Sequence, residues 1–180
     1  LMDIPTEDAI KEFTGGSHLL VRSLVHMDNP DHQLYRSLTQ KWFAPPNLES
    51  LKKDIRNIAK EYVNKMVDYG SECDFAKDIA IFYPLRVIMS ILGVPKEDEP
   101  RMLRLTQELF GGRDEDMIRD ESETSSESNT ITDFFEYFNA LTEDRRKNPT
   151  NDVSSVIANA QINNEQLGHL EAMSYYVIIA

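Results

Sequence analysis

Two side chains in the segment MDNPDHQLYR, residues 27–36, could together bind an anionic group. His32 and Arg36 are four residues apart, so on a helix they project from the same face. A neutral imidazole donates one hydrogen bond, and a guanidinium adds a permanent positive charge with a forked set of donors. The pair could clamp one or two carboxylates, or a phosphate. A simpler alternative stays open, in which His32 helps to start the helix and Arg36 pairs with Asp28 or Asp31.

The helix that carries this pair is predicted over residues 29–44. Asn29 is a good N-cap, and Pro30 suits the first helical position because its missing N–H is no loss there. Phe43 follows His32 by eleven residues, which make almost three helical turns. We therefore expect Phe43 near the same face.

The composition excludes several classes of protein. The chain has 180 residues, 41% hydrophobic and 28% charged, which is typical of one soluble globular domain. Its net charge of −12 disfavours nucleic acid and anionic membrane as partners. No apolar run reaches the roughly 18 residues of a membrane span, and the first ten residues do not resemble a signal peptide. The single cysteine, Cys73, allows no internal disulfide bond. We expect a cytoplasmic protein.

The hydrophobic spacing is helical along nearly the whole chain, so we expect an all-α structure without paired strands. The clearest pattern runs over 47–70, where apolar residues recur at steps of three and four and Gly70 can end the helix. A very apolar helix is expected over 84–93, with Pro84 in its first turn and Gly93 at its end. The acidic, serine-rich residues 113–129 predict a mobile connection.

The last segment becomes more apolar toward its end, YYVIIA, and stops without glycine, proline or a basic last turn. The last four carbonyls of a helix need partners, and such an apolar face needs cover. We therefore expect this helix to continue beyond Ala180 and the chain to be a piece of something larger.

Residues 27–48, MDNPDHQLYRSLTQKWFAPPNL, closely resemble the helix C region of bacterial cytochrome P450 haem-thiolate monooxygenases. That family's pattern is an Asp-x-Pro-x-His-x-x-x-Arg run followed by Phe-x-Pro, and it is matched here by Asp28, Pro30, His32, Arg36, Phe43 and Pro45. YPLRVIMSILGVPKED looks like the family's helix E, and LTEDRRKNPTNDVSSVIANAQINNEQL looks like its helix G to helix H passage. LEAMSYYVIIA looks like the opening of helix I. The resemblance covers nearly the whole chain.

The resemblance implies a single partial domain over 1–180, equivalent to the B-to-I part of a mainly α-helical fold. The implied elements are the B–C loop (14–27), helix C (29–44), helix D (47–70), helix E (84–93), the F–G lid region (96–147), helix H (152–161) and the start of helix I (164–180). The family's β-regions, its Glu-x-x-Arg pair and its cysteine-ligand loop, Phe-x-x-Gly-x-x-x-Cys-x-Gly, have no match. Cys73, in GSECDFAKD, is interpreted as an ordinary free cysteine.

Carried over residue by residue, His32 and Arg36 match the pair that contacts a haem propionate in this family. We assign no catalytic residue and no metal ligand in this chain, and we expect no turnover from the 180 residues alone. Candidate substrate-pocket residues are Leu19, Leu20, Val21, Leu24, Val25, Phe110, Met117, Phe134 and Ala180. For the loop and lid residues among them, packing in the core is the alternative.

For a complete protein, the resemblance implies a haem (iron protoporphyrin IX) monooxygenase that uses O2 and electrons from a ferredoxin or flavoprotein. Its substrate would be apolar, such as a terpenoid, a sterol or another lipid. We expect a monomer without a nucleic-acid or membrane partner. The alternative is a non-enzymatic helical interaction domain that binds no haem. A zinc or di-iron site is not expected, because the histidines His18, His26 and His169 are too scattered along the chain. A phosphate-binding loop is not expected at TGGSHLL either, because this segment follows no predicted strand.

Overall fold

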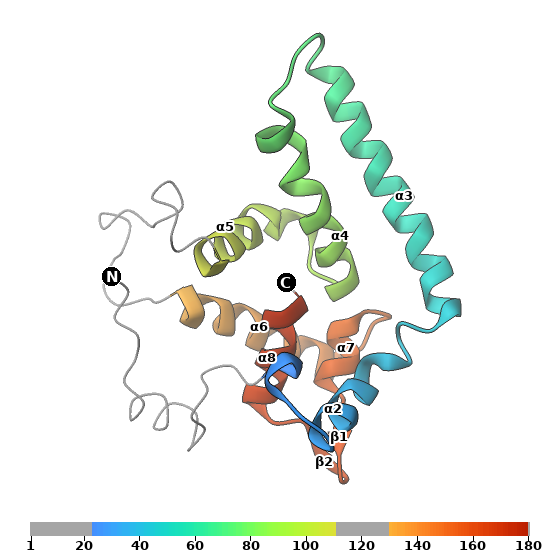
Figure 1. Ribbon diagram of the computed structural model, residues 1–180, viewed down its shortest axis with the longest axis vertical. Helices are drawn as coiled ribbons and strands as arrows, with labels where there is room; N and C mark the ends of the chain where they lie inside the picture. The colour runs from blue at the N-terminus through green and yellow to red at the C-terminus, as the bar shows by residue number, and fades with distance from the viewer. Residues whose placement is uncertain (1–22, 111–129, 180) are drawn as a thin grey trace.

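The computed structural model describes residues 23–110 and 130–179, which are mostly helical (Figure 1). The elements are the 3-10 turn η1 (Leu24–His26), α2 (Asp31–Gln40), α3 (Pro45–Asp68), the π-helical turn η2 (Ala76–Ala80), α4 (Phe82–Leu92), the 3-10 turn η3 (Lys96–Asp98), α5 (Glu99–Phe110), α6 (Thr130–Lys147), α7 (Val153–Ala158), β1 (Gln161–Ile162), β2 (Glu165–Gln166) and α8 (His169–Ile179). The predicted helical fold class is confirmed.

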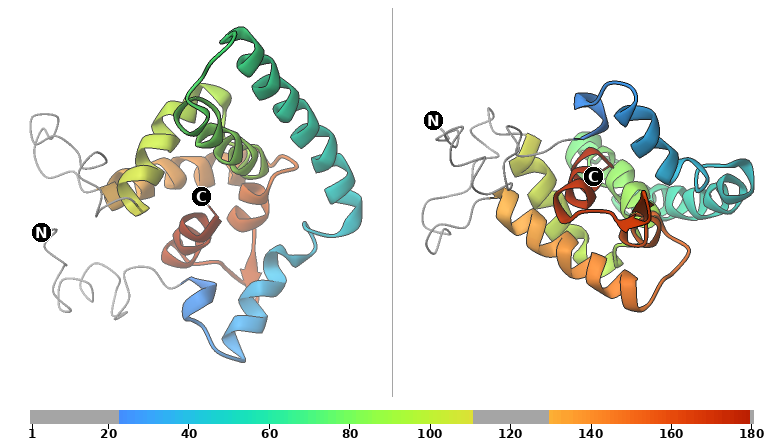
Figure 2. Two further views of the ribbon diagram at one scale, coloured as in Figure 1. Left: turned by 45° about the horizontal axis from the view of Figure 1, so that its top comes forward. Right: turned by 90° about the horizontal axis from the view of Figure 1, so that it is seen from below.

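The helix α8 lies at the centre of the core. Its residues Ala172–Tyr176 are all buried, as expected for a helix that is apolar on every side. Figure 2 shows α8 between α6 on one side and the η1–α2 segment on the other, and α7 also packs against it. The Tyr176 ring stacks on Phe138 of α6 with centroids 4.5 Å apart, and Thr142 Oγ1 donates a hydrogen bond to Tyr176 Oη at 3.0 Å. These contacts join α6 to α8.

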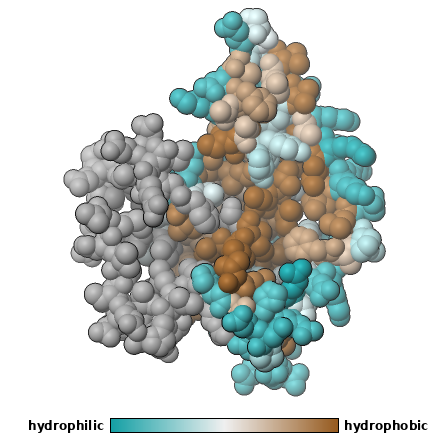
Figure 3. Space-filling view, in the orientation of Figure 1, coloured by the Kyte–Doolittle hydropathy of each residue, from teal (hydrophilic) through white to brown (hydrophobic). Residues whose placement is uncertain are grey.

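The longest helix, α3, is only partly covered. It packs against α4, and Ile58 is its buried residue. Val63 and Val67, near its end, are 57% and 70% exposed, and Ile178 of α8 is 43% exposed. Figure 3 shows apolar side chains gathered in a hollow over α8, α4 and the inner side of α3. The described residues therefore leave an apolar surface open between these helices.

The helix predicted over 29–44 is shorter at both ends. α2 begins at Asp31, and the residue before it, Pro30, makes no side-chain capping hydrogen bond. Main-chain carbonyls, and not the Asn29 side chain, accept hydrogen bonds from the first turn of the helix. The His32 N–H, for example, donates to the Asp28 carbonyl oxygen at 2.9 Å. At the other end, Pro45 disfavours helical backbone at Ala44, which has ψ 156°. Phe43 therefore lies in a turn and not on the helix.

The expectation of no paired strands is wrong at residues 161–166. β1 and β2 form a short antiparallel hairpin in which Gln161 pairs with Gln166 and Ile162 with Glu165. Asn163 and Asn164 link the strands with φ of 55° and 66°, the conformation of a tight hairpin turn, which asparagine tolerates. The hairpin ends the helix predicted over 152–161 early, at Ala158, and delays the one predicted over 164–180 to His169.

Arg145 of α6 joins the end of α4 to the start of α7. Gly93 ends α4 with φ +68°, as its position in the sequence predicts. Arg145 Nη2 donates to the Gly93 carbonyl at 2.8 Å, and Arg145 Nε donates to Asp152 Oδ2 at 2.7 Å. Asp152 also caps α7, because its Oδ1 accepts from the Ser155 N–H at 2.6 Å. One guanidinium thus connects α4, α6 and α7.

The environment of Asp152 stabilises its ionised form. The side chain is buried, which on its own would raise the pKa, but hydrogen bonds from Thr150, Arg145 and the Ser155 N–H outweigh this effect. They hold the pKa of Asp152 below its ordinary value of 3.8. The ion pair is therefore intact at neutral pH.

Replacing Gly93 by alanine should destabilise the protein more than the same change at Gly70. Both glycines have a left-handed backbone, with φ +68° and +84°, which costs an alanine about 1–2 kcal/mol. A Cβ at Gly93 would also overlap the Asp152 carboxylate, within 2.6 Å of its Cγ, whereas a Cβ at Gly70 meets nothing within 4 Å. We expect a loss of roughly 3 kcal/mol or more for Gly93→Ala in urea unfolding. Equal losses for the two variants would contradict this packing.

Stability should fall in acid through the titration of Asp152. Because its pKa is lower in the folded protein, its contribution is complete above the ordinary value of 3.8 and is lost as the pH falls through the folded value. Asp152→Asn should cost about 3 kcal/mol at neutral pH and flatten the dependence of the unfolding free energy between about pH 5 and pH 2.

The matched control is Asp144→Asn. Asp144 also pairs with Arg145, but its side chain is 48% exposed. We expect this variant to lose less than about 1 kcal/mol and to keep the acid transition of the parent protein. An acid transition that shifts in Asp144→Asn but not in Asp152→Asn would reverse the assignment.

Candidate functional site

The two donors on α2 have no partner within the described part of the chain. His32 is half-buried and Arg36 is exposed, and they lie one turn apart on the helix. No ion pair joins Arg36 to Asp28 or Asp31, and the side chains of His32 and Arg36 make no hydrogen bond to another described residue. The local salt bridge that the spacing alone allows is thus not formed. The two side chains remain available to an external anion.

The face of α2 next to the two donors holds the helix in place. Tyr35 and Leu38 are half-buried against the core cluster, and Thr39 and Trp42 are buried. The hydroxyl of Tyr175 on α8 donates a hydrogen bond to the Tyr35 carbonyl. Burial raises the pKa of Tyr175 above its ordinary value of 10, so the hydroxyl remains a donor at neutral pH. The core thus orients α2 so that its donors are left outside.

The structure places the other candidate residues in different surroundings. Leu24 packs partly buried against the core, and Val25, next to it, is 72% exposed. Phe134 is 1% exposed and lies 4.5 Å from the Phe138 ring, as a core residue does. Phe110 is the last residue of α5. Five further candidates lie outside the described residues: Leu19, Leu20, Val21, Met117 and Ala180.

Cys73 lies far from the donors of α2. It is exposed, in the connection between α3 and η2. Figure 1 shows this connection at the far end of α3 from α2, and a helix of 24 residues is about 35 Å long. A group bound by His32 and Arg36 would therefore be out of reach of the Cys73 thiol.

Sequence reasoning did not find the contact that orients α2. Tyr35 and Tyr175 are 140 residues apart, and each looks like an ordinary apolar helix position. Sequence reasoning also did not single out Met27, which is buried and lines a small pocket between η1 and α8. A local motif could not have identified either residue.

No helix within the described ranges combines the length and apolarity needed to cross a bilayer.

No protein-family model matches the chain. A search of curated proteins finds cytochrome P450-terp of a Pseudomonas species, 40% identical over the whole chain. It also finds a methyl-branched lipid omega-hydroxylase of Mycobacterium bovis, 29% identical over 87% of the chain. Among solved structures, CYP108D1 from Novosphingobium aromaticivorans is 45% identical, with a TM-score of 0.76 over 96% of the chain.

The chain belongs to the cytochrome P450 family. It spans 44% of the length of cytochrome P450-terp and 40% of that of the CYP108D1 chain. This P450 chain therefore has the helical part described above, and the remaining length of its relatives has no counterpart in the 180 residues. The predicted family membership is confirmed.

Tyr175→Phe should loosen α2 of this P450 without unfolding the protein. The change removes the hydrogen bond to the Tyr35 carbonyl and should cost about 1 kcal/mol in urea unfolding. Amide hydrogen exchange should become faster in α2 and not in α3. Tyr83→Phe is the control, since Tyr83 has a ring contact with Tyr62 but no hydrogen bond from its hydroxyl to a described residue. Equal exchange rates in both variants and the parent would contradict the role of Tyr175.

Proposed function

We propose that this chain acts as part of a complete haem monooxygenase, in which His32 and Arg36 hold a haem propionate. The observation that carries the proposal is a pair of donors on α2 that have no partner among the described residues. By the resemblance of residues 27–48, the two side chains match the family's propionate contacts. Burying a carboxylate costs several kcal/mol unless donors meet it. Charge-assisted hydrogen bonds from an imidazole and a guanidinium are suited to that task.

The charge distribution of the chain supports an anion at this place. With a net charge of −12, most of the surface would repel a propionate. Arg36 offers a permanent positive charge that no acid of the described residues neutralises. Its planar fork can also meet both oxygens of one carboxylate, which a lysine cannot do. The donor set therefore fits a haem propionate.

In the proposed enzyme, haem supplies the activation of O2 with electrons from a ferredoxin or flavoprotein. The axial thiolate would come from outside these 180 residues. The part of this chain is to bind and orient the cofactor and to exclude water from it. The exposed Ile178 and half-buried Val177 and Ile179 in the last turn of α8 would form an apolar wall for that purpose.

The proposed reaction inserts one oxygen atom from O2 into an apolar substrate. The relatives named above include a hydroxylase of methyl-branched lipids, which favours a terpenoid, a sterol or another branched lipid. Val25, exposed on η1, is the described B–C loop residue best placed to meet such a substrate. The proposed enzyme is monomeric.

The deciding experiment is the absorption spectrum of the complete gene product, reduced and bound to carbon monoxide. A red-shifted Soret band typical of thiolate-ligated haem is expected. A complete protein that folds, with the helical content of this chain, but takes up no haem would instead favour the helical interaction domain.

Arg36→Ala should weaken haem binding in the complete protein. Loss of a charge-assisted hydrogen bond costs about 1.5–3 kcal/mol, so we expect haem transfer to apomyoglobin to be favoured roughly tenfold or more. The haem affinity of Arg36→Lys should lie between those of the parent protein and Arg36→Ala, because lysine keeps the positive charge but lacks the forked donors of the guanidinium. The control is Arg56→Ala, which removes another exposed arginine from α3. Equal haem retention in Arg36→Ala and Arg56→Ala would exclude the propionate role.

A further inference from the structure

The turn η1 has one buried side and one exposed side. Ser23 and Met27, which flank it, are 3% and 9% exposed, whereas Val25 between them is 72% exposed. The backbone is closed by two hydrogen bonds, from the His26 N–H to Ser23 O at 2.9 Å and from the Met27 N–H to Leu24 O at 3.3 Å. Val25 is thus an exposed apolar side chain on a turn whose two ends are anchored.

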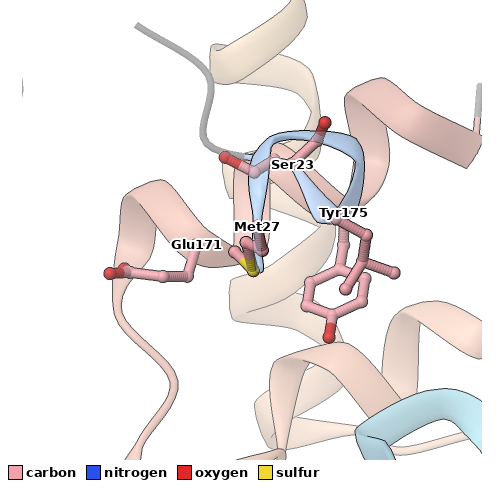
Figure 4. Close-up of a pocket in the computed structure, with 6 residues that line it drawn as sticks. Ser23, Met27, Glu171 and Tyr175 are labelled. Atoms are coloured by element: carbon pink, nitrogen blue, oxygen red, sulfur yellow. The ribbon is translucent and has the colours of Figure 1, made fainter. Parts of the chain in front are cut away.

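The buried side of η1 rests on α8. Ser23, Leu24 and Met27 line one small pocket together with Glu171, Ser174 and Tyr175 (Figure 4). In this view Met27 is seen between Glu171 and Tyr175. Methionine is unbranched and polarisable, so it fills irregular gaps and packs well beside aromatic rings. Met27 is the largest side chain that η1 and its flanks bury at α8.

The residues of α8 that line this pocket are held in place by hydrogen bonds. The Tyr175 hydroxyl is bound to the Tyr35 carbonyl of α2, and Ser174 Oγ donates to the Leu170 carbonyl at 2.8 Å. On the η1 side, Ser23 Oγ and His26 Nδ1 are 3.1 Å apart and hydrogen-bonded. Both sides of the pocket are therefore held by hydrogen bonds of their own.

We propose that Met27 is a positioning residue for substrate selection: by packing against α8 at the wall of this pocket, it fixes the place of Val25 without touching the substrate itself. The inference rests on the proposed function, because Val25 faces a substrate only in a complete P450. Shortening Met27 leaves a gap beside Tyr175, and η1 then gains freedom to move over α8. Val25 would no longer be held at one distance from the substrate, and discrimination between substrate shapes would fall.

The test compares two ten-carbon alcohols, the cyclic menthol and the linear 1-decanol, as probes of the complete haem-loaded protein. Their dissociation constants are read from the change in the haem Soret absorbance on binding. We expect Met27→Ala to reduce the ratio of the two constants at least threefold, with unchanged haem content. Met27→Leu should restore the parent ratio, because a side chain of similar volume again packs against α8.

Val25 provides the internal check. Val25→Ala should also change the ratio, and Met27→Ala should add nothing in a Val25→Ala background if it acts through Val25. Val63→Ala, which shortens an exposed valine on α3, is the matched control and should leave the ratio unchanged. If Met27→Ala does not fold, Met27→Val takes its place with a smaller expected change in the same direction.

An unchanged ratio in Met27→Ala or Met27→Val would overturn the proposal, as would additive effects of the Val25 and Met27 changes. A parent protein in which neither alcohol alters the haem spectrum would contradict the apolar pocket on which the inference depends. Failure of the proposed function looks different, since the complete protein would then lack the carbon monoxide-bound thiolate band altogether.

Discussion

The burial of α8 is the constraint on which the other elements depend. A helix that is apolar on every side must be covered on every side, and Ala172–Tyr176 form a run without an exposed residue. α6 and α7 provide part of the cover, and η1 provides another part. Tyr176 and Tyr175 add directional contacts to this packing, the first toward α6 and the second toward α2. The orientation of α2 and the position of η1 depend on this arrangement.

The donors of α2 illustrate how a core can prepare a binding surface. One side of the helix is fixed by Tyr35, Leu38 and the bond from Tyr175. The adjoining side carries His32, which is half-buried, and Arg36, which is exposed. The charges that this chain does neutralise lie elsewhere, as in the buried pair of Arg145 and Asp152 that joins three helices. The buried ions are paired, whereas the α2 donors have no partner among the described residues.

The apolar surface in Figure 3 fits the length of the chain relative to its family. Such a continuous apolar surface would be unfavourable in water. The relatives are more than twice as long as the part that this chain matches. In the proposed enzyme this surface would be covered by haem, substrate and the rest of the polypeptide.

The sequence by itself determined the helical class, the order of the helices and the spacing of His32 and Arg36, because helix periodicity and capping are local properties. Residues 27–48 were enough to indicate the family. Tertiary structure alone decided that Arg36 avoids the acids near it, that Phe134 is buried and that Val25 is exposed. It also decided that Tyr175 of α8 bonds the Tyr35 carbonyl of α2 and that Met27 is buried beside α8. These outcomes depend on contacts between segments up to 140 residues apart, and no local pattern encodes such contacts.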